Sequence, residues 1–270
     1  MNIQFIGENL ILTDAEHLNI PLCLDCGQAF RWKETENGIW QGIAYGKFLS
    51  LKQEENKITF FNTTKEDFEN FWVKYFDLER NYENILSSYD EENLITACKA
   101  YPGIRILKQD EWEAICSFII SANNNIPRIK GIIERLCENF GEKINGGYTF
   151  PAPEKLACHE VEDLAVIRSG FRAKYIIDAA RKISSGEVDL EKVKTMDFEA
   201  AKNELLKIKG VGEKVAQCSL LYGFGRMEAF PVDVWVKRIV AELYPDGLPE
   251  CIKGTEGIAQ QYLFHWRRNL

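Results

Sequence analysis

Residues 197–223 read DFEAAKNELLKIKGVGEKVAQCSLLYG. Asp197 can cap a helix that runs to about residue 207, and Gly223 can end a second helix over 213–222. The turn Ile208-Lys-Gly-Val-Gly212 joins them, so the stretch predicts a helix-hairpin-helix. Its glycines let the backbone approach a partner closely, and the free N–H groups of the second helix suit a phosphate.

Two residues in and after this hairpin have the chemistry of a reactive site. Lys214 lies in the first turn of the second helix, where the positive helix end disfavours a protonated amine, and a neutral amine is a nucleophile. Nineteen residues later, Phe230-Pro-Val-Asp-Val-Trp235 places Asp233 at the N-cap of a helix. Each has an ordinary alternative, Lys214 as a surface or phosphate-contacting lysine and Asp233 as a cap only. Together they indicate a catalytic site.

The two parts of the chain differ in pattern. The first ninety or so residues predict short strands at 39–45, 48–52 and 58–61, because aromatic and β-branched residues alternate with turn-like clusters. From residue 64 onward the pattern is helical. We therefore expect an α+β protein with a small N-terminal antiparallel sheet domain and flanking helices, 1–95. An all-α region of two helical subdomains, 96–270, should follow and contain the hairpin.

One helix of the second part is especially well marked. Apolar residues at helical spacing begin at Ile129 and end at Phe140, and Gly141 follows as a C-terminal stop. Pro127 falls where a proline would occupy the first helical position. An earlier helix should begin at about Asp110.

The composition is that of a folded globular chain. The 270 residues are 46% hydrophobic and 27% charged, which excludes a disordered protein. No apolar run approaches the roughly 20 residues of a membrane span, and the N-terminus shows no secretory signal. The eight cysteines are therefore expected to be reduced thiols. Cys23 and Cys26 form the only close pair, which we interpret as two thiols in or beside a strand and not as a zinc site.

The net charge of −8 is unevenly distributed. Residues 1–100 hold 9 Lys and Arg against 17 Asp and Glu, whereas residues 101–270 hold 24 of each. Between residues 205 and 238 there are six basic residues and three acidic ones. A local basic face is therefore available, and the overall charge does not exclude a nucleic-acid partner.

Several motifs resemble the helix-hairpin-helix DNA glycosylases with the G/P…D signature, and within them the 8-oxoguanine DNA glycosylases. Besides GVGEKVAQC and PVDVW, these are Gly27-Gln-Ala-Phe-Arg-Trp32, Ser121-Ala-Asn-Asn-Asn-Ile-Pro-Arg128, Gly170-Phe-Arg-Ala-Lys-Tyr175 and Gly257-Ile-Ala-Gln-Gln-Tyr-Leu-Phe264. The resemblance runs nearly end to end. It implies a base-excision repair enzyme that flips 8-oxoguanine out of duplex DNA and excises it, preferably opposite cytosine.

The resemblance also implies catalytic roles. Lys214 matches the nucleophile that attacks C1′ and forms a Schiff base with the deoxyribose, which permits β-elimination at abasic sites. Asp233 matches the carboxylate that stabilises the oxocarbenium-like sugar. Gly210, Val211 and Gly212 match the hairpin turn that contacts a DNA phosphate. The enzyme is thus expected to be a bifunctional DNA N-glycosylase and abasic-site lyase.

Base recognition follows from the same resemblance. 8-Oxoguanine carries a hydrogen on N7, where guanine has a hydrogen-bond acceptor. The family uses a glycine main-chain carbonyl at the position matching Gly27, and this carbonyl would accept a hydrogen bond from N7–H. Cys218 and Phe264 match the residues that sandwich the flipped base, and Gln260 matches the residue that reads its Watson–Crick edge. From the residues alone these four would be a strand-ending glycine, a core thiol, an aromatic beside a buried stripe and a surface glutamine.

On the opposite strand, Asn123, Arg128 and Arg172 match the residues that hydrogen-bond the unpaired cytosine, and Phe171 matches the aromatic wedge. Without the resemblance we would interpret Asn123 as a loop residue and both arginines as solvated.

The sequence departs from the family at two positions. Trp235 stands where the family often has a histidine, which puts that phosphate contact in doubt. Tyr222 stands where vertebrate relatives have a methionine, so details of the pocket can differ.

Other interpretations are weaker. Alkylated-base glycosylases of the same fold generally lack the hairpin lysine that Lys214 would provide. Endonuclease III and adenine glycosylase relatives carry four closely spaced C-terminal cysteines, but only Cys251 lies beyond Cys218, so we expect no iron–sulfur cluster. A non-enzymatic DNA-binding module would not need Lys214 and Asp233 together, and a generic helical scaffold would not bind DNA.

The expected partner is double-stranded DNA containing 8-oxoguanine. We expect the protein to bind it as a monomer and not to associate with a membrane. The resemblance also implies a structural cation, monovalent or divalent, held by the main-chain carbonyls of Leu206, Ile208 and Val211. We expect an intracellular protein, cytoplasmic or nucleoid-associated if the source is a bacterium or archaeon.

Overall fold

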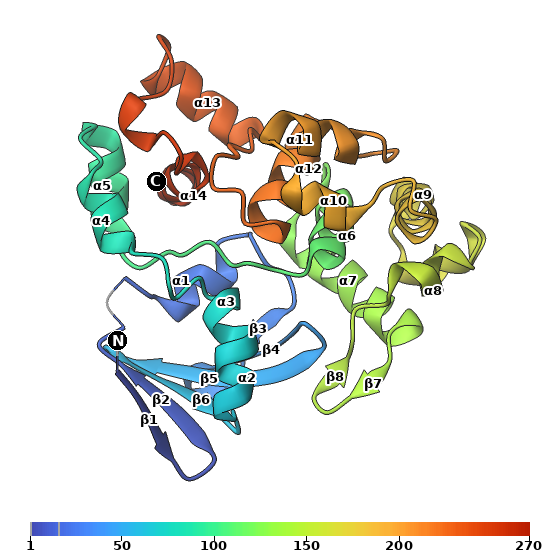
Figure 1. The fold of residues 1–270 in the computed structure, drawn as a ribbon, viewed down its shortest axis with the longest axis horizontal. Helices are drawn as coiled ribbons and strands as arrows, with labels where there is room; N and C mark the ends of the chain where they lie inside the picture. The colour runs from blue at the N-terminus through green and yellow to red at the C-terminus, as the bar shows by residue number, and fades with distance from the viewer. Residues whose placement is uncertain (1, 16) are drawn as a thin grey trace. The chain divides into compact units, whose positions relative to one another are not determined.

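The computed structural model describes residues 2–15 and 17–270, and these form two compact units (Figure 1). The first unit comprises the described residues up to 42 together with 49–108 and 227–270. The second comprises 43–48 and 109–226. Each compact unit combines segments that are not consecutive in the chain. The sequence boundary that we expect at residue 95 divides the chain once, so the units do not test it and it stays a prediction.

The first unit is built on a six-stranded sheet with strand order β1-β2-β6-β5-β4-β3. The pairs β1–β2, β2–β6, β5–β6 and β3–β4 are antiparallel. The three strands expected from the sequence are confirmed as β4, β5 and β6. The strand bounds are β1 Asn2–Ile6, β2 Asn9–Thr13, β3 Trp32–Glu34, β4 Ile39–Ala44, β5 Lys47–Glu54 and β6 Lys57–Phe61.

A helical run crosses this sheet (Figure 1). It buries aromatic side chains against the sheet. The rings of Phe68 and Phe76 meet the ring of Phe60 edge-on, with centroids 5.2 and 5.9 Å apart. Trp32 Nε1 donates to the Tyr75 hydroxyl at 2.6 Å, so a buried indole N–H is satisfied within the cluster. The run consists of α2 Lys65–Asp67, the π-helical turn η2 Phe68–Trp72 and α3 Val73–Tyr75.

The other helices of this unit include the C-terminal helix α14, which packs against α5 and α13. Their bounds are α1 Ile20–Asp25, η1 Glu36–Gly38, α4 Tyr82–Ser87, α5 Glu92–Ala100, α13 Val234–Leu243, η6 Glu250–Ile252 and α14 Glu256–Arg268.

The expectation that Cys23 and Cys26 lie in or beside a strand is wrong. Cys23 lies in α1, and Cys26 is the C-cap residue of that helix. The helix forms because the Asn19 side chain accepts from the Leu22 N–H at 3.0 Å and Pro21 fits the second helical position. Burial raises the pKa of the Cys23 thiol to about 11, so it stays protonated at neutral pH.

The second unit is helical, and its core helix is α6, almost all of whose residues are buried. This helix packs against α7, α9, α12 and η5. The helix and strand bounds are α6 Glu111–Ser121, α7 Ile126–Phe140, β7 Lys143–Ile144, β8 Gly147–Tyr148, α8 Pro153–Ala157, η3 Glu162–Ile167, η4 Gly170–Arg172, α9 Ala173–Ser184, α10 Leu190–Thr195, α11 Phe198–Leu206, α12 Glu213–Cys218 and the π-helical turn η5 Ser219–Gly223.

The well-marked helix α7 and its end before Gly141 are confirmed, with one correction at the N-terminal end. It begins after Asn125, whose side chain accepts from the Arg128 N–H, so Pro127 is the second helical residue and not the first. Gly141 follows the last residue, but its φ of −80° is not left-handed. A Cβ there would lie 2.1 Å from the Thr149 carbonyl oxygen, so glycine is needed for close approach.

The α+β fold expected from the sequence is confirmed: an N-terminal sheet precedes a helical region. Among residues 2–15 and 17–270, none of the helices has both the length and the apolar character that a membrane span requires.

Candidate active site

The helix-hairpin-helix is formed by α11 and α12, close to the predicted bounds. Asp197 caps α11 by accepting from the Ala200 N–H at 2.9 Å. In the turn, the Val211 N–H donates to the Ile208 carbonyl at 3.1 Å. The Lys209 N–H donates to Asp178 Oδ2 on α9 at 2.8 Å, which fixes the turn to a neighbouring helix. The second helix differs from the prediction because it changes to a π-turn after Cys218.

The two turn glycines are required for different reasons. Gly210 has a φ of +84°, and a Cβ there would lie 2.4 Å from the Tyr175 ring. Gly212 is the N-cap of α12 with a φ of −96°, and a Cβ there would meet nothing within 4 Å. Gly210 therefore lets the turn pack on α9, whereas Gly212 leaves open space where a phosphate could approach the helix N–H groups.

Gly210→Ala is expected to lower the free energy of unfolding by about 2–4 kcal/mol, because the left-handed backbone and the ring overlap both oppose a methyl group. Urea denaturation measures this change. Gly212→Ala is the matched control and should stay within about 0.5 kcal/mol of the wild type. Equal effects of the two substitutions would contradict the assigned difference.

Lys214 lies in the first turn of α12, as expected. Its Nζ donates at 3.4 Å to Oγ of Ser121, which is the last residue of α6. The same Nζ lies 5.2 Å from the centroid of the Phe118 ring, which stacks on Tyr222. Among the described residues no carboxylate forms an ion pair with Lys214. The Lys214 side chain is half-buried. Its amine therefore contacts a hydroxyl group and the face of an aromatic ring, and it has no ion pair with a described carboxylate.

Cys218 lies one turn further along α12 and is buried. Residues four apart share a helix face, so Lys214 and Cys218 lie on one side of this helix. The role of Cys218 in sandwiching a base stays a prediction.

Arg172 is placed differently from a solvated arginine. Only 2% of the residue is exposed, and its Nε and Nη2 donate to the Ala122 carbonyl at 3.1 and 2.6 Å. Nη2 also donates to the Asn123 carbonyl at 2.8 Å, and Nη1 donates to the Ser169 carbonyl at 3.3 Å. Four of its five N–H groups are thus engaged by loop carbonyls, and one stays available.

The neighbours of Arg172 complete this cluster on the second unit. Burial, and next the nearby charge of Arg128, lower the pKa of the Arg172 guanidinium. Arg128 is exposed in the first turn of α7, and Asn123 has a φ of +49°. The Phe171 ring lies 4.4 Å under the Arg172 guanidinium and is 54% exposed. The structure therefore brings together the four residues that the resemblance assigns to the opposite strand.

Three recognition residues lie on the first unit. Gly27 follows the C-cap of α1 with a φ of +91°, which favours glycine. Gln260 on α14 is 5% exposed, and its Oε1 has no hydrogen-bond partner within the described part of the chain. Phe264 is half-buried on the same helix, with the Arg268 guanidinium 5.9 Å from its ring. A buried amide oxygen without a partner is costly, so Gln260 has the property expected of a residue that reads a ligand.

Asp233 is the N-cap of α13, as predicted, and its Oδ1 accepts from the Val236 N–H at 2.8 Å. Around it, Val232, Val234 and Trp235 are exposed. The Arg238 guanidinium lies over the Trp235 ring, 5.5 Å from its centroid. Trp235, which replaces the family's histidine, thus forms a cation–π pair with Arg238. Asp233 belongs to the first unit and Lys214 to the second.

Sequence reasoning assigned no role to four residues that support candidate site residues of their own unit. Ser121 and Phe118 hold Lys214, and two buried glutamines, Gln28 and Gln261, hold the chain around Gly27. Ser121 and both glutamines lie inside the quoted motifs, which is the only signal that could have indicated them.

No group of three or more His, Cys, Asp or Glu side chains in the described ranges is arranged to hold a metal ion. The hairpin turn presents main-chain oxygens instead. The Ile208 carbonyl accepts from the Val211 N–H and retains a second lone pair, so neutral oxygens of this turn fit a hard cation.

Comparison with known proteins identifies the class. Residues 116–248 match the family model described as HhH-GPD superfamily base excision DNA repair protein. Residues 10–115 match the model described as 8-oxoguanine DNA glycosylase, N-terminal domain. The fold and the hairpin with its lysine thus define a helix-hairpin-helix DNA glycosylase.

The relatives define the family more narrowly. The chain is 34% identical to the N-glycosylase/DNA lyase of Saccharomyces cerevisiae, over 82% of this chain and 67% of that protein. It is similar to the 8-oxoguanine glycosylase/lyase of Clostridium acetobutylicum in complex with double-stranded DNA containing cytosine opposite 8-oxoguanine. That match has a TM-score of 0.93 and 37% identity, over 100% of this chain and 98% of that one.

A second structure, MBOgg1 in complex with a low-affinity DNA ligand, is 42% identical with a TM-score of 0.92, over 99% of this chain and 98% of that one. The chain belongs to the 8-oxoguanine DNA glycosylase/lyase family of the HhH-GPD superfamily.

Proposed function

We propose that this protein is a bifunctional base-excision repair enzyme that flips 8-oxoguanine from duplex DNA, excises it and cleaves the resulting abasic site. The observation that carries the proposal is Lys214, held at the start of α12 by Ser121 and Phe118 and without an ion-paired carboxylate among the residues that the structure describes. It occurs in a chain that is similar over its whole length to an 8-oxoguanine glycosylase/lyase. A non-enzymatic DNA-binding module would not need this amine together with the Asp233 carboxylate.

The Lys214 amine attacks C1′ of the flipped nucleotide, and the C1′–N9 bond breaks with its electron pair going to the departing base, which takes up a proton. The sugar ring then opens to a Schiff base with Lys214. Loss of a C2′ proton expels the 3′ phosphate by β-elimination. The negative charge of Asp233 stabilises the positive charge that develops on the sugar.

Recognition of the base is assigned to the residues that match the recognition residues of the family. The Gly27 carbonyl accepts the N7 hydrogen that distinguishes 8-oxoguanine from guanine. The unpartnered Oε1 and the amide of Gln260 read the Watson–Crick edge, and Phe264 and Cys218 cover the faces of the base. These roles stay proposals.

The direct test is incubation with a duplex containing 8-oxoguanine opposite cytosine in the presence of borohydride. Reduction of the Schiff base to a secondary amine would give a covalent protein–DNA adduct. Such an adduct would support the substrate class and the lysine chemistry together. Excision without an adduct would indicate a glycosylase that uses water instead.

Discrimination at the opposite strand is expected to favour cytosine over adenine by roughly 5- to 150-fold, because adenine leaves a charged donor unsatisfied. With four N–H groups of Arg172 engaged by loop carbonyls, Arg128 should contribute most of this preference. Single-turnover excision opposite each of the four bases measures it, in the wild type and in Arg128→Ala.

Lys174→Ala is the matched control for this experiment. Lys174 lies over the Tyr175 ring on α9, and its removal should weaken binding to every duplex alike, as expected for a phosphate contact. Equal wild-type rates opposite cytosine and adenine would refute the preference. A preference unchanged in Arg128→Ala would assign it to other residues.

The cation at the hairpin is also a proposal. The carbonyls of Leu206, Ile208 and Val211 would hold it, and it would stabilise the turn beside a DNA phosphate without taking part in the reaction. We further expect no iron–sulfur cluster, a monomer, and action on DNA inside the cell.

A further inference from the structure

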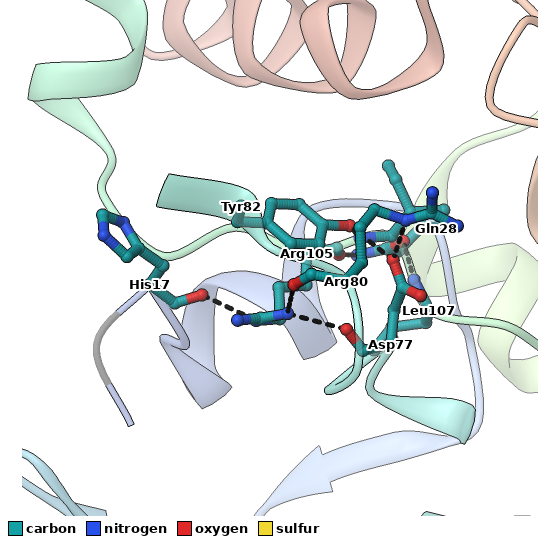
Figure 2. Close-up of polar contacts among 8 residues, drawn as sticks. His17, Gln28, Asp77, Arg80, Tyr82, Arg105 and Leu107 are labelled. Carbon is teal, nitrogen blue, oxygen red and sulfur yellow. Dashed lines mark hydrogen bonds and ion pairs between the residues drawn. The ribbon is translucent and has the colours of Figure 1, made fainter. Parts of the chain in front are cut away.

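The residue after Gly27 is a buried glutamine with every polar group engaged. Gln28 is completely buried, and its Nε2 donates to the Cys23 carbonyl at 3.0 Å and to the Arg105 carbonyl at 2.8 Å. Nε2 also contacts Cys26 Sγ at 3.3 Å, and Oε1 accepts from the Leu107 N–H at 2.9 Å. The amide therefore joins the end of α1 to the segment 105–107 (Figure 2).

The segment that receives Gln28 is itself fixed. The Arg105 guanidinium is buried and donates to the carbonyls of His17 at 2.8 Å and Asp77 at 2.7 Å. It lies 4.4 Å from the centroid of the Tyr82 ring, and the Tyr82 hydroxyl accepts from the Ile106 N–H at 2.9 Å. Figure 2 shows this network around Arg105. Gln28 is thus attached to a rigid support, and any change in its hydrogen bonds would be transmitted to Gly27.

A second buried glutamine holds the other side of Gly27. Gln261 Nε2 on α14 donates to the Cys26 carbonyl at 3.4 Å, and this carbonyl belongs to the peptide that precedes Gly27. Gln261 follows Gln260, whose Oε1 has no partner among the residues described. The Tyr262 hydroxyl donates to the Ile104 carbonyl at 3.1 Å, so α14 is tied to the same support. The network therefore joins the two residues assigned to read the base.

We propose that Gln28 and Gln261 are positioning residues that hold the Gly27 carbonyl and the Gln260 amide in a fixed mutual geometry, and so set the discrimination between 8-oxoguanine and guanine. The proposal rests on the function proposed above. A recognition carbonyl must be held within about 0.5 Å of its productive position, and a glycine at φ +91° has no side chain of its own to restrain it. The flanking glutamines supply that restraint.

A purely structural role makes a different prediction. If Gln28 only stabilised the fold, its loss would reduce all activities together, in proportion to the unfolded fraction. If it positions Gly27, recognition of the intact lesion should suffer, while cleavage of a preformed abasic site should not. An abasic site has no base for Gly27 to read, but it still offers C1′ to Lys214.

The test compares Gln28→Met with the wild type in three measurements: single-turnover excision of 8-oxoguanine opposite cytosine, relative affinity for 8-oxoguanine and guanine duplexes, and borohydride trapping on a preformed abasic duplex. Methionine keeps the volume and removes the four contacts. We expect the affinity ratio and the excision rate to fall about five- to tenfold, the effect of one misplaced hydrogen bond. Abasic trapping should stay within about twofold.

Gln53→Met is the matched control. The Gln53 amide accepts from the Ile20 N–H at 2.7 Å and donates to the Leu18 carbonyl at 2.9 Å, so it holds the opposite end of α1 from Gly27. Its substitution should lower the melting temperature without changing the affinity ratio.

Gln261→Met is a second variant that removes the contact to the Cys26 carbonyl. It should also lower the ratio of affinities for 8-oxoguanine and guanine duplexes, and it provides the test if Gln28→Met does not fold. Equal loss of excision and abasic trapping, or an unchanged ratio in a folded variant, would overturn the inference. Absence of 8-oxoguanine excision by the wild type would instead overturn the proposed function.

Discussion

Lys214→Gln is expected to abolish the borohydride-trapped adduct and to lower 8-oxoguanine excision by at least about 10³-fold, while binding to the lesion duplex is retained. The amine supplies the electron pair that attacks C1′, and a glutamine amide at the same position is not a nucleophile. Glutamine can still contact Ser121 Oγ, which lies 3.4 Å from Nζ in the wild type, so α12 should fold normally. Gel analysis after borohydride reduction and an electrophoretic mobility assay measure the two properties.

Lys209→Gln is the matched control, because it removes a positive charge from the same hairpin. Lys209 Nζ is an exposed group 3.6 Å from Asp178, and its N–H holds the turn whatever its side chain. This variant should bind DNA more weakly in low salt but still form the adduct. Retained trapping in Lys214→Gln would assign the nucleophile to another amine.

The hairpin could be predicted from sequence because its signals are local. The Asp197 cap, the glycine turn and the apolar spacing lie within a single stretch, and the structure confirms both helices. The aromatic strands at 39–61 were predictable for the same reason. Local patterns also placed Asp233 at a helix start, where it accepts from the Val236 N–H.

Properties that depend on distant residues could not be predicted. Gly141 was interpreted as a helix stop, but the need for glycine there comes from Thr149, which approaches from another segment. Cys23 and Cys26 are expected in or beside a strand, yet the Asn19 cap and Pro21 make a short helix there. The error at Cys23 concerns a helix of six residues, which is too short for a helical period to be visible in the sequence.

In the candidate site, too, features with local sequence signals could be predicted, and features that depend on distant residues could not. The side chain of Arg172 resembles any exposed arginine in the sequence, and only the fold shows that the carbonyls of Ala122 and Asn123 engage it. Likewise, Gln28 and Arg105 are 77 residues apart, so no sequence spacing could indicate their contact. The roles of the individual site residues stay predictions that the experiments above address.

Asp233→Asn is expected to lower base excision by about 10²–10³-fold without lowering the melting temperature. Asparagine caps helices about as well as aspartate, so its Oδ1 can still accept from the Val236 N–H at the start of α13. What is lost is the negative charge, and stabilisation of a developing positive charge on the sugar commonly contributes this much to a rate. The substitution therefore separates the two roles of the carboxylate, since it keeps the cap and removes the charge.

Single-turnover excision and thermal denaturation should be measured together for this variant. Asp197→Asn is the matched control: it makes the same change at the cap of α11, where Asp197 accepts from the Ala200 N–H at 2.9 Å, and it should leave excision unchanged. A near-normal excision rate in Asp233→Asn would show that Asp233 acts only as a cap. An equal loss in both variants would show that the effect is not specific to a charge beside the sugar. A loss confined to Asp233→Asn, with both proteins melting like the wild type, is the result that a transition-state role requires.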